Sequence, residues 1–148
     1  MNRPVRWSLA ALLLFGAIQF IPYGHDHRNP EVLAEPEWDS PQTRELFTRA
    51  CGDCHSHRTR WPAYASVAPV SWLIAHDVAE GREKFNVSAW GMQKRNKGKD
   101  AAEELQEGEM PPAIYTMMHP EARLSAEEKK RLIDGLKRTF GEEKKKED

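Results

Sequence analysis

The sequence has only two cysteines in 148 residues, Cys51 and Cys54, and they lie three positions apart. Cysteines this close together cannot join distant parts of the chain, so the disulfide framework of many small secreted domains is excluded. A disulfide between the two would close a very small loop and add little stability. The pair therefore indicates a chemical role.

A strong charge imbalance is also lacking, because the formal net charge is −1 although 30% of the residues are charged. This balance predicts no nucleic acid partner. The length suits one small domain with extensions. Aliphatic residues are sparse from Asp39 to Gly141, so a hydrophobic core in this part would be marginal without help. A large apolar cofactor would supply the missing apolar volume.

Sustained alternation of apolar and polar residues is absent, so no strand is predicted, and the fold class is all-α. Helices are expected to start at Ser40-Pro41, to span Ser71 to Phe85, and to span Asp100 to Gln106 with a stop at Gly108. Residues 96–99 are expected to form a loop. The clearest helix starts with a capping box at 125–128 and ends at Gly141.

The N-terminus carries Arg3 and Arg6 before an apolar run from Trp7 to Ile21. This order is typical of export signals. A small-x-small cleavage site does not follow closely, because the candidate at 32–34 lies beyond several charged residues. We therefore expect an uncleaved transmembrane helix, with a cleaved signal peptide as the alternative. The positive-inside rule places everything after Tyr23 on the outer side.

The chain is thus divided into a membrane anchor or signal segment at 1–24, an extended solvated linker at 25–40, a cofactor-binding domain at 41–141 and a charged disordered tail at 142–148. The expected location is the bacterial inner membrane, with a single pass and the domain in the periplasm.

Cys51, Cys54 and His55 form a C-x-x-C-H pattern, which is the signature of covalent c-type haem attachment. Positions three and four apart share one face of a helical turn. Two thiols can therefore reach the haem vinyl groups while His55 reaches the iron. Gly52 and Asp53 are expected to point away and only to permit the turn.

Three other interpretations use the same residues. A thioredoxin-like redox pair would need a βαβ pattern nearby, which is not seen. A zinc site could use both cysteines with His57 or His76, but a second ligand pair at the usual spacing is missing. A local disulfide would contribute little. Export, helical patterning and the thin core all favour haem.

The sequence also resembles the bacterial haem-binding domain proteins, which are related to the monohaem cytochromes c. The resemblance covers roughly Pro41 to Phe140. It rests on the stretches 51–56, Trp61-Pro62, 67–74, 76–78, 80–82, Trp90, 108–112 and 119–124. It implies a small cytochrome c-like helical domain with long loops, one covalently bound haem c with its iron, and an electron-transfer or redox setting.

The sixth iron ligand is expected to be Met110, which lies between the helix stop at Gly108 and the pair Pro111-Pro112. This resembles the methionine loop of monohaem cytochromes c, whose thioether raises the reduction potential. His76 is the alternative and would give a bis-histidine haem. Packing of Met110 in the core remains open.

Several side chains are candidates for further contacts with the haem. Arg58 and Arg60 could pair with its propionates. Trp61 and Trp72, together with Tyr64 and Trp90, are candidate crevice aromatics. A backbone carbonyl near Pro69 could accept the Nδ1 proton of His55.

The expected function is single-electron transfer by a membrane-anchored monohaem protein, for which no catalytic residue is needed. The alternative is a haem enzyme or sensor whose sixth site is open or displaceable and acts on peroxide or a small gas. A third hypothesis is a periplasmic module that only holds haem. The sequence does not identify a redox partner.

Overall fold

The computed structural model describes residues 2–141, and every regular element in that range is helical. The expected all-α class is therefore confirmed. One isolated bridge, between Ala34 and Ala89, is the only β pairing in the described range. The longer helices are α1 (Arg3–Ile18), α2 (Pro41–Ala50), α4 (Val70–Lys84), α5 (Ala101–Glu107) and α7 (Ala126–Phe140). The shorter ones are α3 (Gly52–His55), α6 (Ala113–Met118), and the 3-10 turns η1 (Ala63–Ser66), η2 (Gly98–Asp100) and η3 (Pro120–Ala122).

Local capping signals account for several helix ends. The Ser40 hydroxyl accepts the Thr43 N–H and Pro41 occupies the first turn of α2. Ser125 and Glu128 form the expected capping box of α7, and Gly108 ends α5 with φ 85°. The expected loop at 96–99 instead enters η2, and helix α6 was not predicted.

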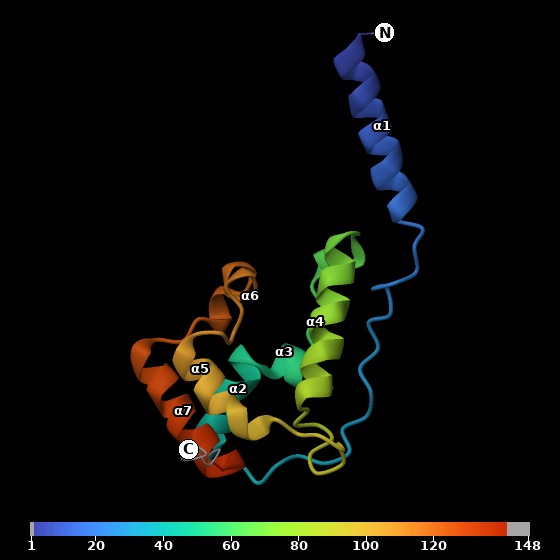
Figure 1. Cartoon of the computed structure of the whole chain (residues 1–148). Coiled ribbons are helices and arrows are strands. Elements are labelled where there is room, and N and C mark those ends of the chain that lie inside the picture. The colour runs from blue at the N-terminus through green and yellow to red at the C-terminus, as the bar shows by residue number, and fades with distance from the viewer. Residues whose placement is uncertain (1, 142–148) are drawn as a thin grey trace, which may run out of the picture.

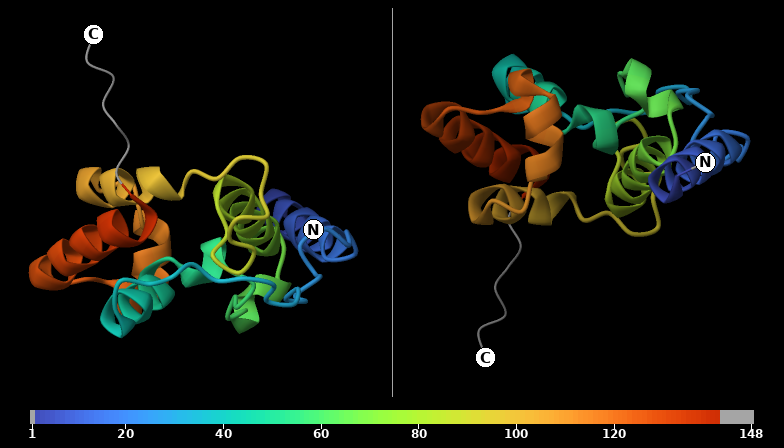
Figure 2. Two further views of the ribbon diagram at one scale, coloured as in Figure 1. Left: turned by 90° about the horizontal axis from the view of Figure 1, so that it is seen from below. Right: turned by 90° about the horizontal axis from the view of Figure 1, so that it is seen from above.

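Two groups of helices face one another across the short α3 (Figures 1 and 2). Helices α2, α5 and α7 enclose the core, which is centred on Phe47, Leu132, Leu136 and Phe140. Helix α4 stands on the other side and packs against α3 and η1. The C-x-x-C-H motif therefore lies at the junction of the two groups.

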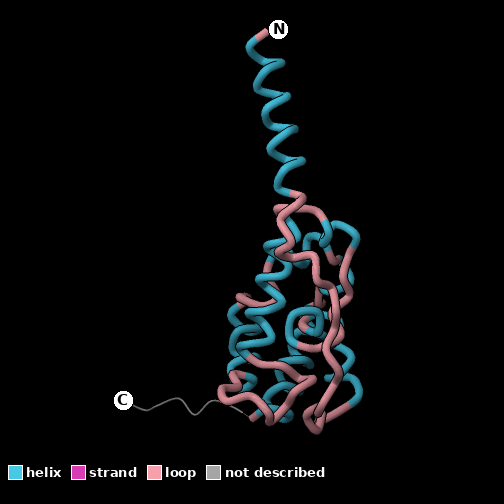
Figure 3. The backbone as a smooth tube through the Cα atoms, turned by 90° about the vertical axis from the view of Figure 1, so that its right-hand side faces the viewer, coloured by secondary structure: helices cyan, strands magenta, loops and turns pink. Residues whose placement is uncertain are grey.

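Helix α1 projects from one end of the domain and has no buried residue (Figure 3). Its exposed apolar side chains include Trp7, Leu12, Leu13 and Leu14. Among residues 2–141, no helix combines the length and the apolar character needed to cross a membrane. A helix of 16 residues is therefore present where a transmembrane helix was expected, but its membrane-spanning character is not confirmed.

The segment after α1 is extended, but the expectation that it is solvated is wrong. Leu33 and Ala34 donate their N–H groups to the Ser88 carbonyl, at 2.8 and 3.2 Å, and Trp90 donates to Ala34 at 3.1 Å. His27 stacks on Trp61 with ring centres 4.6 Å apart. These backbone and ring contacts fix residues 27–38, here called the strap, along the domain. The predicted disordered tail at 142–148 lies outside the described residues.

Candidate haem-binding site

The two cysteines and the histidine of the C-x-x-C-H motif are brought together by one tight turn. Cys51 ends α2, and its carbonyl accepts the N–H groups of Cys54 at 3.2 Å and His55 at 3.0 Å. All three residues line a single cavity of about 740 Å³. That volume lies within the range of about 300–1,000 Å³ that is usual for ligand and cofactor sites.

Gly81 allows α4 to lie directly against this turn. A Cβ at position 81 would be 2.7 Å from the Cys54 carbonyl oxygen and 2.9 Å from its Cβ. Only glycine fits such an approach. Glycine at this position of α4 is therefore needed to form the cavity wall.

His55 is held in a defined orientation. Its ring is 8% exposed and stacks on Phe85 with centroids 4.1 Å apart. Its Nδ1 lies 3.2 Å from the Phe85 carbonyl, and because a carbonyl only accepts, Nδ1 carries the proton. Burial lowers the pKa of His55, which keeps the ring neutral. Nε2 is then the nitrogen with a lone pair for a metal.

A carbonyl near Pro69 was expected to accept the Nδ1 proton of His55, but the carbonyl of Phe85 accepts it instead. The Pro69 carbonyl accepts the N–H groups of Trp72 and Leu73 in the first turn of α4, so it is engaged within that helix.

Both cysteine side chains are free thiols at the cavity wall. Burial raises the pKa of each thiol to about 12, and the neighbouring Cys54 adds to the effect at Cys51. A thioredoxin-like pair works instead through a thiolate of lowered pKa and a βαβ framework, and neither is present in the described residues. No group of three or more His, Cys, Asp or Glu side chains in residues 2–141 is arranged to hold a metal ion, as a zinc site would require.

Asp53 does much more than permit the turn, contrary to expectation. It is 5% exposed and accepts hydrogen bonds from the Arg60 backbone at 2.9 Å and from the Tyr115 hydroxyl at 2.7 Å. Burial, followed by this bond to Asp53, raises the pKa of Tyr115. The motif is thereby tied to α6, which lies 62 residues away in the chain.

A second set of polar contacts, made by His119, lies beside the bond between Asp53 and Tyr115. His119 stacks on Tyr115 at 4.5 Å, and its Nε2 lies 2.8 Å from the Tyr64 hydroxyl. Tyr64, Tyr115 and His119 all line the cavity.

Met110 lines the same cavity, as expected for a ligand candidate. The αL conformation of Gly108 turns the chain, and the Glu104 carbonyl then accepts the Met110 N–H at 3.2 Å. Met117 and Met118 also line the cavity, but Met110 is 38% exposed against 68% and 53% for the other two. Of the three thioethers, that of Met110 is therefore the most enclosed.

Other candidates lie elsewhere. His76 is outside the cavity lining, with its side chain 65% exposed and 3.6 Å from Glu80. Trp61 and Trp72 do not line the cavity either, and Trp90 stacks on Phe140 in the core. Trp61 is engaged with His27 of the strap.

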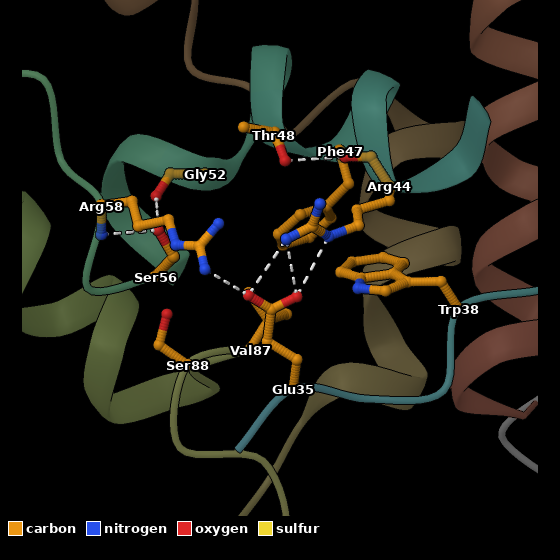
Figure 4. Close-up of a pocket in the computed structure, with 10 residues that line it drawn as sticks. All are labelled: Glu35, Trp38, Arg44, Phe47, Thr48, Gly52, Ser56, Arg58, Val87 and Ser88. Atoms are coloured by element: carbon orange, nitrogen blue, oxygen red, sulfur yellow. Dashed lines mark hydrogen bonds and ion pairs between the residues drawn. The ribbon is translucent and has the colours of Figure 1, made fainter. Parts of the chain in front are cut away.

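The two arginines have different surroundings. Arg60 lines the cavity, with its guanidinium 3.2 Å from Asp53. Arg58 lies in a separate small pocket and is 2.8 Å from Glu35, which also binds Arg44 (Figure 4). Arg58 was expected to pair with a propionate, but the structure engages it with the strap carboxylate instead.

The donor set and the cavity fit a covalently held haem. The two thiols and one imidazole share a wall, the imidazole presents one free nitrogen, and most of the remaining lining is apolar.

A comparison with protein families agrees, because the haem-binding domain family matches residues 13–138. The chain belongs to this family. No curated protein and no solved structure matches it at a significant level. The family match begins inside α1 and includes the strap, so the haem-binding domain extends beyond the helical core toward the N-terminus.

Proposed function

We propose that this haem-binding domain protein carries one haem c, attached through Cys51 and Cys54, and transfers single electrons outside a membrane to which α1 attaches it. The observation that carries the proposal is the shared cavity of the two thiols and His55, with the His55 Nδ1 proton already committed to Phe85. A bound haem would supply a one-electron couple between two iron states.

The protein residues have distinct parts in this function. Cys51 and Cys54 would hold the macrocycle, and His55 would offer Nε2 to the metal. Phe85 fixes the His55 tautomer through its carbonyl and the ring plane through stacking. Met110 would offer its thioether to the iron, and Arg60, which also lines the cavity, would pair with a propionate.

A second candidate function rests on the polar wall of the cavity. Tyr64, Tyr115 and His119 offer hydrogen-bonding groups beside the cofactor space. If the sixth position is open, these groups would favour an enzyme or sensor that binds peroxide or a small gas. The state of the sixth position therefore separates the two candidates.

Attachment through α1 is supported by its exposed apolar surface and by the packing of the strap. Phe20 and Ile21 continue the apolar stretch beyond the helix end. Cleavage near Ala34 would remove His27 from Trp61 and the Leu33 N–H from Ser88. Retention of the N-terminal segment is therefore expected, with the domain on the periplasmic side of the bacterial inner membrane.

Covalent attachment is tested by haem staining after denaturing electrophoresis of protein expressed with a c-type haem maturation system. The parent should retain stain on the polypeptide. Cys51→Ala and Cys54→Ala should each retain less, and the double variant none, whereas Met92→Ala outside the cavity should match the parent. Complete extraction of haem from the parent by acid and acetone would contradict the assignment.

Membrane attachment is tested separately by fractionation. The parent should stay with membranes after an alkaline wash. Leu12→Arg together with Leu13→Arg should release it, while Leu33→Arg, at an exposed strap residue, should not. A soluble mature form that starts near Glu35 would show that the segment is a cleaved signal.

A further inference from the structure

Three stretches of more than ten residues contain no Asp, Glu, Lys or Arg. They are residues 7–24, 61–75 and 110–120, in a chain that is 30% charged. The first forms α1 and its exit, the second forms η1 and the first part of α4, and the third leads into and forms α6. Their shared composition suggests a shared environment.

The structure brings the three stretches to one end of the molecule. Gln19 joins the first two, because its Oε1 accepts the Ala68 N–H at 2.9 Å and its Nε2 donates to the Ala68 carbonyl at 3.0 Å. Figure 1 shows α6 and the start of α4 reaching toward the side from which α1 leaves. The loop that carries Lys94, Arg95 and Lys97 lies at the opposite end.

Exposed apolar side chains cover this end. They comprise Val67, Val70 and Leu73 beside α1, and Ile114, Met117 and Met118 on α6, and they are from 43% to 68% exposed. We call these six residues the rim. Five of them, all except Val67, also line the haem cavity, so the cavity opens to solvent at the rim, and this opening is here called its mouth. The lining continues from there to Lys97 near the opposite end.

We infer that the rim rests in the same lipid surface as α1, so that the mouth of the haem cavity faces the membrane. This rests on the proposed attachment through α1. The paired bonds between Gln19 and Ala68 fix the root of α1 to the rim side, so insertion of α1 brings the rim to the bilayer. Transfer of the apolar rim out of water is favourable, whereas transfer of the charged opposite end would be opposed by its loss of hydration. A bilayer would explain why all three uncharged stretches lie at the same end of the molecule, since the first of them forms α1.

The inference is tested on full-length, haem-loaded protein in lipid nanodiscs that contain a phospholipid with a diazirine near the top of one acyl chain. After irradiation, adducts are mapped by mass spectrometry of proteolytic peptides. Peptides that contain 67–73 and 113–118 should be labelled several-fold more than the peptide that contains 91–97. Adducts on α1 without adducts on the rim would overturn the inference and leave membrane attachment intact. Absence of adducts on α1 would refute the attachment itself.

A matched pair of variants tests the rigid link. Gln19→Ala removes both bonds to Ala68, and rim labelling should fall while α1 labelling persists. Ser8→Ala removes a bond internal to α1, from the Ser8 hydroxyl to the Pro4 carbonyl, and should leave rim labelling unchanged. Unchanged rim labelling in Gln19→Ala would show that this link does not set the orientation.

Discussion

Gly81 and Cys54 approach each other so closely that a Cβ on Gly81 would lie 2.7 Å from the Cys54 carbonyl oxygen. Gly81→Ala should therefore force α4 away from the attachment turn. Overpacking of this kind costs about 1–3 kcal/mol, which exceeds the gain of up to about 1 kcal/mol from alanine in a helix. We expect lower stability in urea unfolding and less covalent haem per polypeptide.

The control for this change is Gly16→Ala in α1, where no atom lies within 4 Å of the added Cβ. Its stability and haem content should equal or exceed those of the parent. Equal haem content in Gly81→Ala and the parent would show that the close packing of α3 and α4 is not required for attachment.

The strap should be protected from hydrogen exchange. The N–H groups of Leu33 and Ala34 bond to the Ser88 carbonyl, and that of Trp90 bonds to Ala34. Amides held in this way exchange only after local opening. Exchange at these three positions should be much slower than in a peptide of the same sequence, as measured by NMR. Exchange at the peptide's rate would restore the interpretation of residues 25–40 as a solvated tether.

Acid should weaken the junction between α2 and α7. The Ser125 backbone N–H and the Arg49 guanidinium lower the pKa of Glu128 from 4.5 to about 2. Because the folded pKa lies below the unfolded one, the stabilisation is complete above pH 4.5 and is lost as the pH falls toward 2. Glu128→Gln should lower stability at neutral pH and flatten its decline over this range in urea unfolding at a series of pH values.

Glu127→Gln is the matched control, because Glu127 pairs with Arg131 within α7 and does not reach α2. It should keep the steep decline of the parent. If the parent and Glu128→Gln lose stability identically as the pH falls, the ion pair with Arg49 does not contribute to the acid sensitivity.

The sequence predicted those features that local residues determine. Ser125 and Glu128 cap α7 through neighbouring backbone groups, and Gly108 ends α5, so both were visible in short patterns. The attachment turn was visible for the same reason.

The contacts that complete the site join distant residues. Asp53 meets Tyr115, and His55 meets the carbonyl of Phe85, 30 positions later. A backbone carbonyl has no signature in the side-chain pattern. The charged strap looked solvated because its contacts use backbone groups, the His27 ring and the pairing of Glu35 with distant arginines. These features follow from tertiary packing, which overrides local composition.

Met110 decides between an electron carrier and an open-site haem protein. Its thioether lines the cavity and is the least exposed of the three methionines there. If it binds the iron, the oxidised protein should show the weak far-red absorption band of thioether ligation, and Met110→Ala should remove it. The reduction potential should fall substantially, because thioether ligation favours the reduced state. Carbon monoxide should then bind more readily.

Three variants separate this outcome from its rivals. Met117→Ala and Met118→Ala change the other cavity thioethers and should retain the far-red band. His76→Ala should change nothing, because that side chain is exposed and lies outside the cavity lining. Loss of the band in Met117→Ala or Met118→Ala would move the ligand to α6. If the parent has no band and already binds carbon monoxide rapidly, the sixth position is open. The groups on the polar wall, Tyr64, Tyr115 and His119, would then face a bound small molecule, and the enzyme or sensor function would replace electron transfer.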